Sequence, residues 1–257
     1  MSTIDQGSDI QDPKMPLTEH LRELRKRLVI IFATVGVAFF ISWGFREYIL
    51  WAVKWPLLRS FPDLKLQFDT LTDPFFSHLK ASFFAAIFLT FPITLGQIWL
   101  FIGPGLYKRE KKVVWPFLLM SFPLFVGGGL FCYMVVFPIA VEFLISFDPS
   151  LAPSLRIGDY LAFTLRLTFV FGLVFEMPLI SLLLTRMGLL TPEFLTSNRR
   201  YAIVIVFIAA AVLTPPDVFT QLLLAGPLII LFEISILISK LTRPKKPPAD
   251  EEEDTGA

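Results

Sequence analysis

The sequence predicts an all-α fold: a polytopic membrane protein with six transmembrane helices. Three observations support this fold class. Of the 257 residues, 54% are hydrophobic and 18% are charged, and the mean hydropathy is +0.66, whereas soluble domains are about 25% charged. The hydrophobic residues are gathered into long blocks, as helices that cross a bilayer require. The basic residues favour one side of the membrane that these blocks would cross.

The composition also excludes several classes of protein. The formal net charge is +1, so no long-range field attracts nucleic acid, and no nucleic-acid partner is expected. Cys132 is the single cysteine, which excludes an intramolecular disulfide and a multi-cysteine metal site. The first apolar block begins near Leu28 and lacks a small-residue cleavage site, so no cleavable signal peptide is expected.

Six apolar blocks follow one another along the chain. They occupy residues 28–45, 76–103, 113–137, 160–183, 201–213 and 218–239. At 1.5 Å per residue, four of them are long enough to cross a hydrocarbon core about 30 Å thick. The fifth block reaches only about 20 Å as a helix. The last two blocks are therefore either two spans or a re-entrant hairpin.

Proline and glycine mark two irregular places. Pro116, Pro123 and Pro138 flank or interrupt the third block around Gly127–Gly129, which predicts a kinked or tilted helix. Residues 214–217 turn the chain directly from the fifth block into the sixth. A bundle with one short helix must thin the bilayer or cover that side with a partner, which hints at assembly.

The distribution of Lys and Arg predicts six spans with both termini in the cytoplasm. Sixteen of these residues then lie in inside segments and five in outside loops, a clear positive-inside bias. The inside residues are Lys14, Arg22, Arg25, Lys26, Arg27, Lys108, Arg109, Lys111, Lys112, Arg186, Arg199, Arg200, Lys240, Arg243, Lys245 and Lys246. The outside residues are Arg46, Lys54, Arg59, Lys65 and Arg156.

The chain divides into three regions. A membrane domain is expected over residues 16–239, between a tail of residues 1–15 and a second tail of residues 240–257. The second tail combines Lys–Pro with a run of five acidic residues. Both tails are expected to be disordered, because such sequences cannot bury enough apolar surface to fold.

Leucines recur at helical spacing just before the first apolar block. They are Leu17, Leu21, Leu24 and Leu28. Residues 16–28 are therefore expected to form an amphipathic helix along the cytoplasmic interface. Glu19, Glu23 and Arg27 are spaced by four on another face. They form either a solvated face with i,i+4 pairs, each contributing a few tenths of a kcal/mol, or a functional cluster.

Four charged residues fall within the apolar blocks: Lys80, Arg166, Glu176 and Glu233. A charge at a helix centre costs about 2.5–3.5 kcal/mol on insertion scales. Lys80 and Arg166 lie toward the outer ends of their blocks, where long side chains can extend to the interface. Glu176 and Glu233 lie in the cytoplasmic halves, so each must be protonated, paired or in a water-filled recess. Both are candidate functional residues.

The sequence does not favour an enzyme. His20 and His78 are the only histidines and are predicted on opposite faces of the membrane, so neither a shared metal site nor a Ser–His pair is expected. No phosphate-binding glycine loop or HExxH motif is present, and no cofactor or metal is expected. A proton-coupled secondary transporter is the alternative function, since it would explain Glu176 and Arg166, although no repeated halves are visible.

Several segments, in order along the chain, resemble the motifs of one family. These are Glu19–Leu28 (EHLRELRKRL), Gln97–Lys112 (QIWLFIGPGLYKREKK), Phe171–Pro178 (FGLVFEMP), Leu213–Gln221 (LTPPDVFTQ) and Leu231–Ile234 (LFEI). The resemblance extends from about Met15 to Ile238. The family is TatC, the multi-spanning subunit of the twin-arginine, or Sec-independent, protein translocase.

The resemblance implies a fold, a function and partners. TatC-like proteins form a concave, glove-like bundle in the bacterial cytoplasmic (inner) membrane and bind the twin-arginine signal peptides of folded cargo. They assemble into an oligomeric complex with TatA-like and TatB-like single-span proteins. The complex exports folded proteins by using the protonmotive force.

The resemblance also implies a signal-peptide site. Glu23 and Glu110 fall on the two acidic positions linked to twin-arginine recognition, and Arg25 falls on an adjacent motif position. Two carboxylates can form charge-assisted, bidentate hydrogen bonds with two guanidinium groups, for which lysine is a poor substitute. We expect Glu23 and Glu110 to converge at the cytoplasmic rim.

Four further positions acquire roles through the resemblance. Glu176 falls on the acidic residue that lines the concave membrane cavity. Asp217 and Gln221, in the outer turn and at the start of the last helix, and Glu233, in that helix, fall where a partner helix is contacted.

Overall fold

The computed structural model describes residues 17–102, 111–148, 150, 153–214 and 217–242. The described residues form helices, with one isolated β-bridge between Gln67 and Arg156. The helices are α1 Leu17–Gly44, α2 Arg46–Ser60, α3 Asp73–Ile102, α4 Lys111–Phe131, the π-helical turn η2 Cys132–Val136, α5 Phe137–Ser146, α6 Ile157–Phe175, α7 Met177–Arg186, α8 Pro192–Ser197, α9 Arg199–Leu213 and α10 Val218–Thr242. The all-α prediction is confirmed.

Five helical segments of the described chain are long and apolar enough to cross a membrane. They are Thr18–Gly44, Asp73–Phe101, Phe117–Ser146, Ile157–Arg186 and Val218–Thr242. The fifth predicted block also forms a helix, α9, but its 15 residues extend only about 22 Å. Five spans are therefore supported by length and composition, and a sixth span through α9 stays a prediction.

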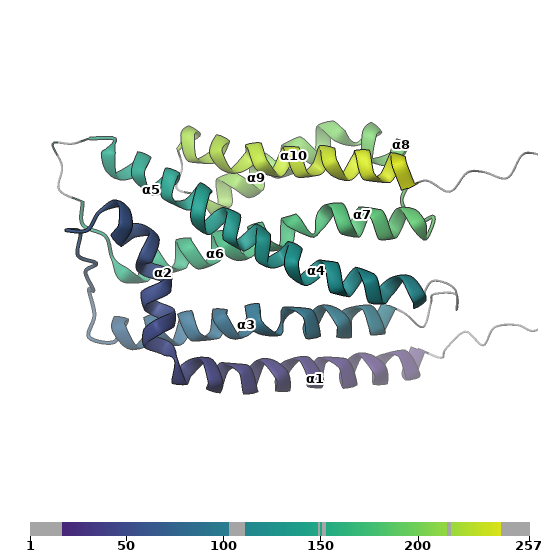
Figure 1. The fold of residues 1–257 in the computed structure, drawn as a ribbon, viewed down its shortest axis with the longest axis horizontal. Coiled ribbons are helices and arrows are strands. Elements are labelled where there is room, and N and C mark those ends of the chain that lie inside the picture. Colours follow the sequence, from purple (N-terminus) through teal and green to yellow (C-terminus); the bar gives the residue numbers. More distant parts are fainter. Residues whose placement is uncertain (1–16, 103–110, 149, 151–152, 215–216, 243–257) are drawn as a thin grey trace, which may run out of the picture.

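The helices form an elongated bundle with two distinct ends (Figure 1). α1 and α3 lie side by side and run in opposite directions, while the continuous path α4–η2–α5 crosses the bundle obliquely. We call the end where α1 begins and α3 and α10 finish the entry end. At the other end α2 lies across the bundle (Figure 1), and we call this the α2 end.

The third span contains the irregularity that proline and glycine predict. It takes the form of the π-helical turn at residues 132–136, which follows the glycines and is separated by Phe137 from Pro138 in the first turn of α5. The glycines have another role. A Cβ on Gly128 would lie 2.6 Å from a ring carbon of Phe175, and one on Gly172 would lie 2.7 Å from the ring of Phe125. These two glycines therefore permit the close approach of α4 and α6.

The segment of residues 16–28, predicted as an amphipathic helix along the cytoplasmic interface, is helical from Leu17 onward, and its place at the interface stays a prediction. α1 runs without a break from Leu17 to Gly44, so the amphipathic segment prolongs the first span. Residues 17–35 contain neither glycine nor proline, and nothing in the local sequence ends the helix. A second difference is α2, which forms where the sequence predicted only an outside loop.

The predicted tails are largely outside the described residues. α10 continues to Thr242, three residues beyond the predicted end of the membrane domain. Residues 1–15 and 243–257 lie outside the described residues, and their disorder stays a prediction.

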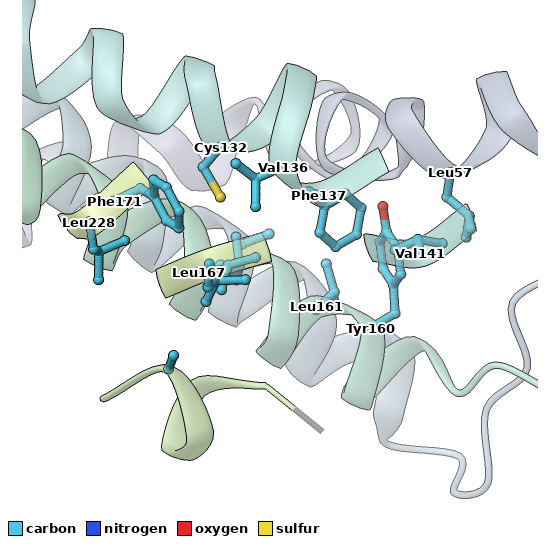
Figure 2. Close-up of a cluster of buried hydrophobic side chains, with 14 of the residues drawn as sticks. Leu57, Cys132, Val136, Phe137, Val141, Tyr160, Leu161, Leu167, Phe171 and Leu228 are labelled. Atoms are coloured by element: carbon cyan, nitrogen blue, oxygen red, sulfur yellow. The ribbon is translucent and has the colours of Figure 1, made fainter. Parts of the chain in front are cut away.

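The hydrophobic core lies where α2, α5, α6 and α10 meet (Figure 2). Its fully buried side chains include Leu57, Phe137, Leu161, Leu167, Phe171 and Leu224. A smaller cluster formed by Trp99, Phe117, Leu179 and Leu183 lies closer to the entry end. The membrane-facing surfaces stay apolar, and α1 in particular exposes large side chains such as Phe32 and Phe40.

Candidate functional site at the entry end

Glu23 belongs to a small polar network that joins α1 to α3. One guanidinium nitrogen of Arg27 donates to Glu23 Oε1 at 3.1 Å, and another donates to Gln97 Oε1 at 3.1 Å. The ring of His20 stacks on Phe101 with a centroid distance of 4.5 Å. Arg27 therefore links the carboxylate on α1 to the amide on α3, close to the point where α3 ends.

The Glu23–Arg27 pair is held in place but accessible. Its side chains are 21% and 22% exposed, and an i,i+4 pair of this kind contributes only about 0.3–0.5 kcal/mol. The Arg27 Nε is buried and has no hydrogen-bond partner among the described residues. The Glu23 carboxylate is therefore weakly engaged and partly accessible.

Of the other two predicted signal-peptide residues, Arg25 and Glu110, the structure describes only Arg25. Arg25 is exposed on α1. Glu110 lies outside the described residues, but α3 ends and α4 begins at the entry end, beside the start of α1 (Figure 1). The convergence of Glu23 and Glu110 stays a prediction.

Glu176 is buried inside the bundle at the junction of α6 and α7. Its side chain is 2% exposed, and the Ser121 hydroxyl of α4 donates to its Oε2 at 2.6 Å. The other oxygen, Oε1, is buried without a partner among the described residues, an arrangement that native proteins rarely leave unexplained. The carboxyl group is enclosed by protein, so its place in a membrane cavity stays a prediction.

Asp217, Gln221 and Glu233 all make contacts within the chain. Asp217 precedes α10 and caps it, because one carboxylate oxygen accepts from Thr220 N at 2.7 Å and the other from the Thr220 hydroxyl. Gln221 Nε2 donates to the Phe207 carbonyl of α9 at 3.1 Å. Their role as partner-helix contacts stays a prediction.

The third of these residues, Glu233, joins α10 to the start of α9. Arg199 lies 3.0 Å from the Glu233 carboxylate, and the two side chains are 44% and 43% exposed. Glu233 was predicted to be protonated, paired or in a water-filled recess, and in the structure it is paired with Arg199. Lys80 and Arg166, by contrast, are exposed on the surface of the bundle.

The two histidines lie at opposite ends of the bundle, His20 near the start of α1 and His78 near the start of α3. They cannot share one centre. Within the described part of the chain, no group of three His, Cys, Asp or Glu side chains could hold a metal ion.

The polar partners that were not predicted from the sequence include Gln97, which accepts from Arg27, and Ser121, which donates to Glu176. Both lie inside predicted apolar blocks. A glutamine in such a block is unusual and could have been noticed. A single serine carries no comparable signal, because its partner is 55 residues away.

Comparisons with known proteins agree with this architecture. Residues 19–227 match the family model of the Sec-independent protein translocase protein (TatC). A relative from Desulforapulum autotrophicum named Sec-independent protein translocase protein TatC is 41% identical over 247 residues, covering 95% of this chain and 90% of the relative. One of the same name from Aquifex aeolicus is 43% identical over 235 residues, covering 90% and 98%.

A solved structure is similar as well. The crystal structure of a twin arginine translocase receptor TatC superposes with a TM-score of 0.80 at 40% identity, over 87% of this chain and 99% of that one. The chain therefore belongs to the TatC family of Sec-independent protein translocase proteins.

Proposed function

We propose that this chain is the core receptor of a twin-arginine translocase and that it binds twin-arginine signal peptides at the entry end. The family is a protein translocase family and not an enzyme family. The chain is thus a multi-pass membrane component of Sec-independent protein transport. The proposal concerns which part of the molecule recognises the exported protein.

The observation that carries the proposal is the Glu23 carboxylate, which already accepts from a guanidinium at 3.1 Å. A carboxylate offers about four lone-pair positions, so Glu23 can accept from a signal-peptide arginine while Arg27 stays in place. Gln97 holds Arg27 from the opposite side, which keeps the carboxylate oriented. Glu110 would supply the second carboxylate and Arg25 an adjacent contact.

Recognition of arginine over lysine follows from the geometry of the two side chains. A guanidinium presents parallel N–H groups that match a carboxylate, whereas an ammonium is a strongly hydrated point charge. A site with two carboxylates therefore favours an Arg–Arg pair over a Lys–Lys pair.

The entry end is assigned to the cytoplasm, with six spans and both termini on that side of a bacterial inner membrane. The support is the positive-inside rule. Among the described residues, the segments near this end carry Arg22, Arg25, Lys26, Arg27, Arg186, Arg199, Arg200 and Lys240. In this arrangement α9 is the fifth span and is shorter than a hydrocarbon core about 30 Å thick.

TatA-like and TatB-like single-span proteins are the proposed partners in an oligomeric complex driven by the protonmotive force. The proposed contact is the α9–α10 pair with Asp217, Gln221 and Glu233. α9 exposes an apolar face, with Ile205 64% and Val212 70% exposed, that a partner helix could cover. Glu176 is proposed to face a polar recess when the complex assembles, which would hydrate its unpaired oxygen.

Cross-linking tests the signal-peptide site. A twin-arginine peptide with a photoreactive group beside its arginines is bound to the full-length protein in membranes, and the yield of the adduct is measured. Glu23→Gln should lower the yield about tenfold, because a hydrogen bond to a charged group is worth about 1.5–3 kcal/mol. Reversal of the charge at Glu110 should abolish the adduct.

Glu19→Gln is the matched control, since Glu19 is an exposed acid one turn earlier on α1. It should leave the yield unchanged, and a Lys–Lys peptide should give little adduct with any variant. Undiminished cross-linking in both the Glu23 and the Glu110 variants would contradict the assignment.

A further inference from the structure

α2 contains a proline that removes one of its own hydrogen bonds. The helix runs from Arg46 to Ser60 with Pro56 inside it. Proline has no backbone N–H, so the carbonyl of Ala52, four residues earlier, loses its helical donor, and the ring also crowds that carbonyl. Pro56 is nevertheless buried, together with Leu50 and Leu57 on the same helix.

Two tyrosines from the spans donate hydrogen bonds to consecutive backbone carbonyls in this turn of α2. The Tyr133 hydroxyl, on η2, donates to the Ala52 carbonyl. The Tyr160 hydroxyl, on α6, donates to the Val53 carbonyl at 2.8 Å. Figure 2 shows Tyr160 with its hydroxyl directed toward the helix that carries Leu57.

The rings of both tyrosines are fixed by packing. Tyr160 is 5% exposed, and its ring meets Phe137 edge-on at a centroid distance of 5.6 Å. The Tyr133 ring stacks on Trp55 of α2, with centroids 6.4 Å apart and an angle of 18° between the planes. Each hydroxyl is therefore presented to α2 by a ring that has little freedom to turn away.

We propose that Tyr133 and Tyr160 are positioning residues that hold α2 across the end of the bundle. Tyr133 supplies the hydrogen bond that Pro56 takes from Ala52, and Tyr160 adds a bond to the neighbouring carbonyl of Val53. The two tyrosines belong to different spans, so the pair joins α2 to the third span and the fourth span at once. Because Ala52 and Val53 are consecutive, the two bonds also fix the rotation of α2 about its own axis. The consequence for protein export rests on the proposed function, but the positioning role does not.

The test is a double-mutant cycle measured by hydrogen exchange of the full-length protein in lipid nanodiscs. Tyr133→Phe should raise the exchange rate of the α2 amides about fivefold, the factor for one net hydrogen bond. Pro56→Ala restores the N–H that Ala52 lacks, so adding Tyr133→Phe to Pro56→Ala should cause no further increase. Tyr160→Phe should also raise α2 exchange, and α3 should be unaffected in every variant.

Tyr48→Phe is the matched control, because Tyr48 lies on α2 and is 75% exposed. It should leave exchange unchanged. An increase of the same size from Tyr133→Phe with and without Pro56 would overturn the proposal, since the hydroxyl would then act independently of the proline. No increase from either tyrosine variant would overturn it as well.

Export assays add a readout that general destabilisation would not reproduce. Tyr133→Phe and Tyr160→Phe should lower export of a folded cargo, while the yield of the signal-peptide adduct at the entry end stays at the wild-type level. Parallel loss of both would contradict a role confined to α2. If the exchange cycle succeeds and the peptide adduct does not depend on Glu23, the positioning role stands and the proposed binding site fails.

Discussion

The two ends of the bundle use different chemistry. At the entry end, a charged pair that is about one-fifth exposed joins α1 to α3 through Arg27. At the α2 end, neutral hydroxyl groups from two spans bond to backbone carbonyls of α2, and aromatic rings pack around them. The first arrangement leaves a carboxylate that can accept another cation. The second offers no charged group to a ligand and holds α2 in place.

This difference follows from the charge of the bonding groups at each end. A partly exposed ion pair is screened by salt and contributes little, so its carboxylate can also accept from a charged ligand. A hydrogen bond between a neutral hydroxyl group and a carbonyl is not weakened by salt. The bond from Tyr160 to Val53 is also partly buried, so its loss leaves a carbonyl with reduced access to water. The entry end is therefore suited to binding and the α2 end to holding a shape.

Substitutions at the close contact between α4 and α6 should have the largest effect on stability, because these helices connect the two ends of the bundle. Gly128→Ala places a Cβ 2.7 Å from the backbone oxygen of Phe171, which cannot move without shifting α6. We expect a loss of about 3 kcal/mol in the free energy of unfolding, at the upper end of overpacking effects. Thermal unfolding in detergent micelles measures it, and both ends should weaken together.

Gly127→Ala is the control for this prediction, because nothing lies within 4 Å of the position that a Cβ would take there. It should be neutral or slightly stabilising, as expected for alanine in place of glycine in a helix. Equal destabilisation by the two substitutions would show that the close approach of α4 and α6 is not what Gly128 permits.

The hydrogen bond between Ser121 and the buried Glu176 should stabilise the bundle, as the hydrogen bonds at the α2 end do. Ser121→Ala removes the 2.6 Å hydrogen bond to Glu176 and leaves both carboxyl oxygens unpaired. The free energy of unfolding should fall by about 2 kcal/mol, the cost of a buried group without a partner. Ser42→Ala is the control, since the Ser42 hydroxyl is buried without a partner in the described structure.

Glu176→Gln separates charge from polarity at the same position. Full export activity of this variant would exclude an obligatory role for the negative charge.

The serine control decides the meaning of the Ser121→Ala result. A destabilisation by Ser42→Ala as large as that by Ser121→Ala would mean that the loss reflects packing and not the hydrogen bond.

The smallest effect on stability is expected at the entry end. Arg27→Gln removes the ion pair with Glu23 and should lower the free energy of unfolding by only about 0.2–1 kcal/mol, with a smaller effect at high salt. Arg22→Gln, an exposed residue on the same helix, is the control. A loss above about 3 kcal/mol would mean that the entry end is a rigid network like the α2 end, which would remove the contrast between them.

The sequence predicted the helices more reliably than their boundaries and contacts. All six apolar blocks form helices, because a block of apolar residues in a bilayer must satisfy its own backbone. α2 was missed, since Arg46, Glu47, Lys54 and Arg59 interrupt its apolar residues and no periodic face is visible. The continuity of the first helix was not predicted, because the leucine pattern at its start does not specify whether that segment lies along the interface or prolongs a span.

The candidate site shows the same limit. Glu23, Glu176 and Glu233 stand out in the sequence because a charge near or inside an apolar block needs a partner or water. The partners of these residues were mostly not predictable. Only the i,i+4 pair of Glu23 with Arg27 could be read from spacing.

By itself, the sequence determined that the chain enters a membrane, that its six apolar blocks are helical and which family it resembles, because hydropathy and motifs are properties of short stretches. The tertiary structure alone decided that Ser121 meets Glu176, 55 residues away, and that Tyr160 meets Val53, 107 residues away. A hydrogen bond requires two groups about 3 Å apart. That separation depends on how helices pack, and packing is set by the whole bundle at once.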